Sequence, residues 1–157
     1  MPKKEDIKYI IVHHTATDRD TTKFTSLKDS YNWVITADGI LHESRPQNLV
    51  GGHCRADRMN YRSLGICLTG DFRTQQATSY QIKTLTGIIK QLMDLYNIPI
   101  ENVLGHSEVK GSKTVCPGKI LLSIVQGIRD DKNNINKIKK ELKIANEKLD
   151  KIKEILS

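Results

Sequence analysis

The chain has 157 residues, of which 38% are hydrophobic and 27% charged, and its formal net charge is +7 with a pI near 9.3. This length suits one domain with a core of its own. Three cysteines, an odd number, argue against a disulfide framework and favour reduced thiols or metal ligands. The positive charge predicts an anionic partner, but the lysines are dispersed and aromatic residues make up only 5%, so binding to nucleic acid is not supported.

No apolar run approaches the roughly 20 residues of a membrane span. The N-terminal segment also lacks the apolar stretch of a secretion signal. We therefore expect synthesis in the cytoplasm, no membrane span, and release by another agent if the protein acts outside the cell.

The first 129 residues alternate short apolar runs with polar connections, which predicts an α/β domain with a mixed central β-sheet flanked by helices. A tight turn at Asp38-Gly39 is expected to join two of the strands. The expected strands are 7–14, 31–36, 40–45, 63–70 and 101–106. The connections 15–30 and 48–62 are expected to be loops, the first with one helical turn at most.

Two helices are predicted in the same domain. Residues 78–97 carry apolar side chains at helical spacing, with Thr78 or Ser79 as the N-terminal cap and Pro99 as the stop. The second helix is expected to begin at Pro117 and to reach residue 128. It could end at Gly127 or continue into the tail.

The composition changes near residue 130, which divides the chain into a domain (1–129) and a tail (130–157). The tail repeats apolar residues at the two seam positions of a heptad: Ile135, Ile138, Leu142, Ala145, Leu149, Ile152 and Leu156. A stripe this narrow is typical of a coiled coil. The alternatives are a helix folded back on the domain, or a coiled coil that either self-associates into a homo-oligomer or leads to a further module.

Histidine and cysteine residues gather at the ends of the predicted elements. His13 and His14 end the first strand and must point to opposite faces of the sheet. His106 follows a short strand, and Cys116 precedes the second helix. Two imidazoles and a thiolate suit zinc and leave a fourth position for water, as in catalytic zinc sites. The spacing alone is weak support for a zinc site, because a lone histidine at the end of a strand is more often a structural residue.

Four segments, in this order, resemble the type 2 N-acetylmuramoyl-L-alanine amidases: IIVHHTAT, YNWVITADGILHE, NYRSLGICLTGDF and GHSEVKGSKTVCPG. This family includes phage lytic enzymes, and animal peptidoglycan recognition proteins share its fold. The resemblance covers about residues 5–128. It implies a zinc hydrolase that cleaves the amide between N-acetylmuramic acid and L-alanine in peptidoglycan. The small basic domain then suggests a phage or prophage endolysin acting on the bacterial cell wall.

The resemblance also implies roles for single residues. The zinc ligands would be His13, His106 and Cys116. The catalytic side chains would be Tyr31, Thr114 and Lys113. Tyr31 would orient water, and Thr114 or Lys113 would donate to the oxyanion. The resemblance also places His53 along the substrate groove. From their own chemistry, Asn60 and Arg62 could contact the carboxylates of the stem peptide, since the arginine fork binds a carboxylate. A surface or structural role is the alternative for each of the three.

Some residues depart from this pattern. The strand GICLTG has no acid, so we assign no carboxylate general base. The segment between His14 and Tyr31 is short, so the helix that many members carry there is expected to be missing or reduced. His42, Cys54 and Cys67 are expected to be an exposed strand residue, a loop thiol and a small core residue. The alternative function is a peptidoglycan-binding module without catalysis, which the presence of Cys116 makes weaker.

Overall fold

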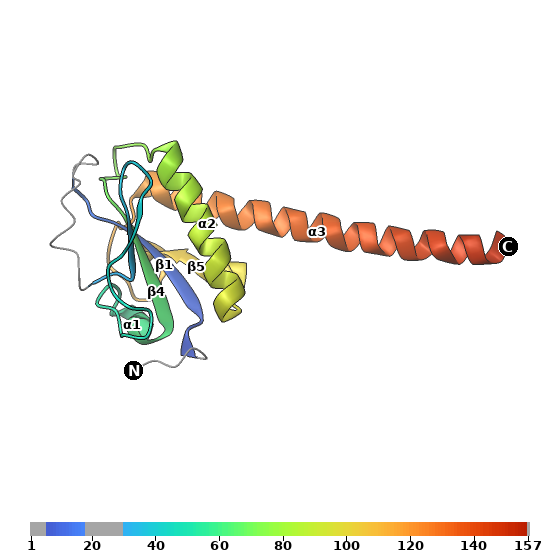
Figure 1. The fold of residues 1–157 in the computed structure, drawn as a ribbon, viewed down its shortest axis with the longest axis horizontal. Helices are drawn as coiled ribbons and strands as arrows, with labels where there is room; N and C mark the ends of the chain where they lie inside the picture. The colour runs from blue at the N-terminus through green and yellow to red at the C-terminus, as the bar shows by residue number, and fades with distance from the viewer. Residues whose placement is uncertain (1–5, 18–29, 157) are drawn as a thin grey trace.

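The protein is described by a computed structural model that places residues 6–17 and 30–156 (Figure 1). Its centre is a five-stranded sheet with the strand order β3-β2-β4-β1-β5. Four strands run parallel and β3 runs antiparallel at one edge. The strands are β1 (Tyr9–His14), β2 (Trp33–Ile35), β3 (Leu41–Glu43), β4 (Ser63–Leu68) and β5 (Val103–Gly105). The predicted mixed sheet is therefore confirmed, with β2, β3 and β5 shorter than expected.

The two faces of the sheet are covered differently. Side chains alternate along β1, so Ile10 and Val12 face one side and Ile11 and His13 the other. The first side packs against α2 (Ser79–Tyr96) and the start of α3 (Lys119–Leu156) in the main hydrophobic core. Ile11 instead belongs to a small cluster formed with the segments that surround the second side. His13 thus lies on the face that the two long helices leave uncovered.

The start of α2 follows the sequence prediction. The Thr78 hydroxyl accepts a hydrogen bond from the backbone N–H of Gln81, and the Gln81 side chain accepts one from the backbone N–H of Thr78. This reciprocal pair satisfies two donors that a helix start otherwise leaves unpaired. The Gln81 amide also donates to the Thr69 carbonyl at 2.9 Å, which anchors α2 to the end of β4. The helix ends at Tyr96 and is capped by Asn97, two residues before Pro99.

Two connections, 15–30 and 48–62, were predicted to be loops. The connection 48–62 is not entirely a loop, because it contains a 3-10 turn (Ala56–Arg58) and the single-turn helix α1 (Met59–Arg62). Only Met59 of α1 is buried, so a helix this short leaves no periodic apolar signal in the sequence. The predicted loop 15–30 lies mostly in residues 18–29, outside the part of the chain that the structure describes.

The prediction that Pro117 begins the second helix is wrong, because α3 begins at Lys119. Gly118 precedes it with a φ of +86°, a left-handed conformation that favours glycine. A Cβ added there would lie 2.4 Å from the carbonyl carbon of Phe72. The chain therefore turns at Gly118 in close contact with the segment after β4, and the helix starts only after this turn.

Helix α3 continues without a break through Gly127 and past residue 129 to Leu156. Only Leu121 and Val125 of this helix are buried, both near its start. Arg129 still contacts Val103 and Glu108, and the later part of the helix extends away from the domain without folding back on it (Figure 1). None of the helices in the described ranges is long and apolar enough to cross a membrane.

Candidate metal centre

Three side chains that are far apart in the sequence meet at one edge of the sheet. His13 lies near the end of β1, and His106 begins a 3-10 turn (His106–Glu108) directly after β5. Because β1 and β5 are parallel neighbours, their carboxyl ends lie side by side. Cys116 reaches the same point from the loop before α3. The possible ligand atoms of the three residues all lie within 4.8 Å of one another.

The backbone fixes these side chains relative to each other. The Cys116 sulfur lies 3.6 Å from Nδ1 of His13, and the rings of His13 and His106 are 4.7 Å apart. The N–H of Ser107 donates to the carbonyl of Cys116 at 2.7 Å, which ties the two loop ligands together. This arrangement brings the three side chains close enough to hold one metal ion.

The charge states of the cluster suit a soft divalent cation. Burial lowers the pKa of His13 well below its ordinary value, with His53 and His106 adding to the effect, and burial also lowers the pKa of His106. Both imidazoles are therefore neutral at pH 7, which is the form that binds metal. Burial raises the pKa of Cys116 to about 11, partly offset by a hydrogen bond from the backbone of His14. Two neutral imidazoles and a thiol that a cation would ionise fit zinc.

His53 lies beside His13, and a contact with substrate remains a prediction for it. It is buried, and its Nδ1 lies 3.0 Å from Nε2 of His13. Since Nδ1 of His13 faces Cys116, a neutral His13 that binds metal through Nδ1 carries its proton on Nε2 and donates it to His53. Burial lowers the pKa of His53 to about 4, so this ring is a neutral acceptor. His53 therefore orients the His13 ring through Nε2, whereas Cys116 lies near Nδ1. His53 also borders the cleft described below.

Two glycines make room for the His53 ring. A Cβ on Gly51 would lie 2.5 Å from the ring, and a Cβ on Gly65 would lie 2.7 Å from it. Gly65 lies inside β4, where a glycine usually marks a close approach of another group. The sequence therefore did contain a signal for the position of His53, but its meaning depended on packing between segments that are not adjacent in the chain.

Removing the His53 acceptor should weaken metal binding. We expect His53→Phe to lower the zinc affinity about 10- to 100-fold, because a second partner that orients a metal-binding histidine contributes about this much. Competition with a chromophoric chelator measures the affinity, and His42→Phe serves as the matched control with unchanged affinity. If His53→Phe keeps the wild-type zinc affinity and raises only KM for peptidoglycan, the ring contacts substrate instead of positioning His13.

Tyr31 lies beside the cluster, with its ring 5.0 Å from that of His13. Its hydroxyl donates to the thiol of Cys67, a fully buried β4 residue that pairs in register with His13. Burial raises the pKa of Tyr31 far above its ordinary value, so the hydroxyl keeps its proton. Cys67 is thus a small core residue that anchors Tyr31 next to the proposed ligands.

Thr114 and Lys113 border an open cleft of about 580 Å³ next to His106 and His53. The Thr114 hydroxyl accepts the backbone N–H of Cys116 at 3.1 Å, so its own proton remains to be donated. Lys113 is exposed. The structure therefore brings both residues to the cleft, but only Thr114 is held by a contact with a ligand residue.

Asn60 and Arg62 do not join this cluster. Both belong to α1, and the side-chain oxygen Oδ1 of Asn60 accepts the N–H of Cys54 at 2.7 Å. The Arg62 guanidinium pairs with Asp57 at 3.1 Å and stacks on Tyr9 at the opposite end of β1 from the metal centre. These contacts support the loop around α1, and a role in binding substrate remains a prediction for both residues.

The other histidine and cysteine residues have structural contacts. His14 points to the helix side of the sheet, where its Nδ1 accepts the N–H of Phe72 at 3.2 Å. His42 is half-buried and contacts Thr36, so it is not the exposed strand residue that we predicted. Cys54 is buried in the small cluster with Ile11, because the loop that carries it folds over the sheet.

Glu108 supports the cluster but was not among the predicted site residues. Its carboxylate accepts the N–H of Gly105 at 2.8 Å and two N–H groups of Arg129 at 2.6 and 2.8 Å. Glu108 lies two residues after His106, so it holds the turn that carries this ligand against α3. The bond from the Gly105 N–H to Glu108 is the acidic half of a capping box, and because glycine has no side chain to supply the other half, the sequence carries no full capping signal here.

The chain is similar to proteins of one family. The profile of the N-acetylmuramoyl-L-alanine amidase family matches residues 3–119. Peptidoglycan-recognition protein SC2 of Drosophila simulans is 32% identical over 130 residues, which span 71% of this chain and 68% of that protein. The endolysin of Enterobacteria phage K11 is 28% identical over 92 residues, or 55% of this chain and 57% of that protein.

Solved structures show the same fold. N-acetylmuramoyl-L-alanine amidase LysC from Clostridium intestinale URNW superimposes with a TM-score of 0.69 at 28% identity, covering 83% of this chain and 87% of that one. Since the family profile spans most of the chain and ends next to Cys116, the protein belongs to the N-acetylmuramoyl-L-alanine amidase family.

Proposed function

We propose that the protein is a zinc-dependent amidase that cleaves the bond between N-acetylmuramic acid and L-alanine in peptidoglycan, as a phage or prophage endolysin. The observation that carries this proposal is the approach of His13, His106 and Cys116 within 4.8 Å at an open cleft. Relatives named as an amidase and an endolysin support it. The net charge of +7 suits an anionic wall polymer.

A zinc ion held by the three ligands would supply a Lewis acid that activates water and polarises the amide carbonyl. The chain's own residues would do the rest. Tyr31 keeps its proton, and its hydroxyl can turn from Cys67 toward the reacting water or the substrate. The Thr114 hydroxyl, with Cys116 N–H on its acceptor side, would donate to the oxyanion. Lys113 would add positive charge at the cleft edge.

Zinc binding should depend on pH through Cys116. The pKa of this thiol is raised to about 11, so between pH 7 and 9 a proton must leave before the sulfur binds zinc. His13 and His106 have lowered pKa values and are already neutral in this range, so they add no further dependence. We expect the apparent zinc affinity to rise about tenfold per pH unit.

Chelator competition at several pH values measures how the apparent zinc affinity changes with pH. The control variant Cys54→Ala should show the same pH dependence as the wild type. An affinity that does not change above pH 7 would mean that Cys116 is already a thiolate in the metal-free protein.

The proposed reaction is tested by its products. Purified peptidoglycan treated with the full chain should yield new α-amino groups of L-alanine, and a chelator should abolish their release. New reducing ends in place of alanine amino groups would assign a glycosidase reaction. Binding to peptidoglycan without any cleavage, in protein shown to contain zinc, would favour the alternative of a binding module, to which the similarity with a recognition protein points.

A further inference from the structure

Helix α3 carries an apolar stripe that nothing in the described chain covers. After Asp130 no residue of the helix is buried, and the exposed fractions reach 62% for Ile138, 60% for Leu142 and 52% for Ile152. An isolated helix is marginally stable in water without a partner for its apolar face. A continuous exposed stripe of this kind marks an interaction surface.

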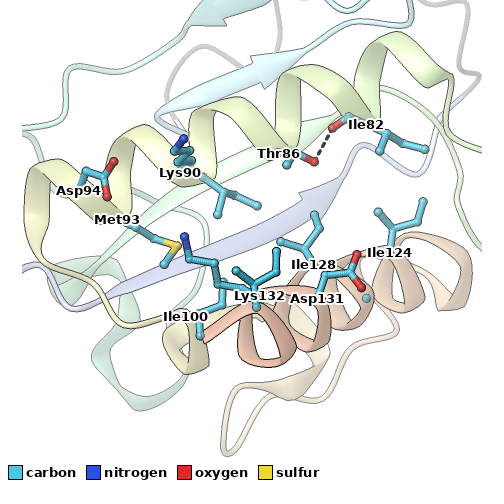
Figure 2. A pocket seen from close by; sticks show the side chains of 13 residues that line it. Ile82, Thr86, Lys90, Met93, Asp94, Ile100, Ile124, Ile128, Asp131 and Lys132 are labelled. Carbon is cyan, nitrogen blue, oxygen red and sulfur yellow. Dashed lines mark hydrogen bonds between the residues drawn. The ribbon is translucent and has the colours of Figure 1, made fainter. Parts of the chain in front are cut away.

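The stripe runs on into a groove between α2 and α3 (Figure 2). Ile128 and Ile135 of α3 line this groove, which has a volume of about 450 Å³. Its apolar lining is completed by Ile82, Ile89, Met93, Ile100 and Ile124. A helix packed along the stripe would therefore find apolar surface from the tip of α3 to the edge of the domain.

We propose that a second copy of this chain covers the stripe, with its α3 antiparallel to the first. Side-chain sizes support this orientation. Centred between the two copies, the antiparallel pairing sets Leu142 of each copy against Ala145 of the other. A parallel pair would set Ala145 against itself and leave a void, whereas large-against-small layers interdigitate. The other layers are apolar pairs: Ile135 with Ile152, and Ile138 with Leu149.

The charges beside the seam favour the same orientation. Glu141 and Lys148 occupy the same heptad position, so in an antiparallel pair Glu141 of each copy faces Lys148 of the other. In a parallel pair Lys148 faces Lys153, and Glu141 faces Asn146. Each arrangement contains one kind of lysine–lysine contact, since the antiparallel pair brings Lys132 near Lys153. Only the antiparallel pair adds attractive pairs.

A lipid surface fits the stripe less well. Helices that lie on membranes carry a broad apolar face with aromatic residues and cations along the opposite face. The exposed part of α3 has no aromatic residue, and its seam occupies only two positions in seven. Its polar face mixes lysine with glutamate and aspartate, including the Lys153–Asp150 ion pair at 3.4 Å. These features favour a second helix.

The association is tested by analytical ultracentrifugation of the full chain from about 1 to 200 μM. We expect a reversible dimer, and we expect Leu142→Lys to raise its Kd at least about 100-fold by placing a charge in the central layer. Asn133→Lys adds the same charge on the far side of the helix and should leave the Kd nearly unchanged. A wild-type chain that stays monomeric throughout overturns the proposal, as does equal dimerisation of the Leu142→Lys variant.

A charge exchange tests the orientation. In the antiparallel pair Lys148→Glu sets a second carboxylate against Glu141 of the other copy, and we expect a Kd about tenfold higher at low salt. Adding Glu141→Lys should restore the wild-type Kd. In a parallel pair Lys148→Glu would tighten the dimer, and that result contradicts the proposal. Monomers that bind anionic vesicles through α3 would assign the stripe to lipid and also overturn it. None of these readouts requires amidase activity, so the proposal fails or stands separately from the proposed function.

Discussion

The Cys116→Ser variant is expected to lose its zinc and at least about 1,000-fold of its amide hydrolysis, because a metal ion contributes several kcal/mol to such a reaction. A serine hydroxyl is a poor zinc ligand at neutral pH, and the two remaining imidazoles of His13 and His106 do not complete a catalytic shell. Metal analysis of the purified variant and release of L-alanine amino groups from peptidoglycan measure the two effects.

Cys54→Ala is the matched control for this variant. Cys54 is a buried cysteine, whereas Cys116 is half-buried, and Cys54 belongs to the small cluster with Ile11 and not to the group around His13. This control should keep its zinc and nearly all of its activity. A Cys116→Ser variant that still binds one zinc and cleaves normally would exclude Cys116 as a ligand.

The second large effect concerns stability. Gly118→Ala is expected to lower the free energy of unfolding by about 3 kcal/mol or more. The φ of +86° disfavours an L residue, and the new Cβ would lie 2.4 Å from the carbonyl carbon of Phe72 and 2.6 Å from the nitrogen of Arg73. Both contacts are with backbone atoms, which cannot move aside as a flexible side chain would. Urea unfolding in the presence of a chelator measures the change without a contribution from zinc.

Substitutions at two other glycines separate the effect of the left-handed backbone from the effect of the close contact with Phe72. Gly111 has nearly the same φ, +82°, but no atom lies within 4 Å of the Cβ position, so Gly111→Ala should cost only about 1–2 kcal/mol. Gly127 lies within α3 with open space around its Cβ position, and Gly127→Ala should raise the free energy of unfolding by roughly 0.5–1 kcal/mol. If Gly118→Ala costs no more than Gly111→Ala, the close contact with Phe72 contributes nothing.

Features that depend on neighbouring residues were predictable from the sequence. The isoleucine-rich run of β1 identified the central strand, and the possible caps Thr78 and Ser79 identified the start of α2. The alternation of side chains along β1 also explained why His13 and His14 contact different faces. In each case the determining interactions lie within one strand or one helical turn.

Features that depend on contacts between distant segments were not predictable. Pro117 looked like a helix start, but the turn at Gly118 is set by Phe72, which is far away in the sequence. His53 was expected only along the substrate groove, whereas its ring also lies beside Gly65 and contacts His13. Such placements follow from close packing of the folded chain, which a residue pattern does not encode.

X-ray absorption spectroscopy of the zinc-loaded full chain tests the central claim most directly. If His13, His106 and Cys116 hold the metal, the spectrum will show about one zinc per chain, with one sulfur at about 2.3 Å and two imidazole nitrogens at about 2.0–2.1 Å. A chain that binds no zinc under these conditions, or a zinc whose shell contains no sulfur, would contradict the metal centre and the amidase function built on it.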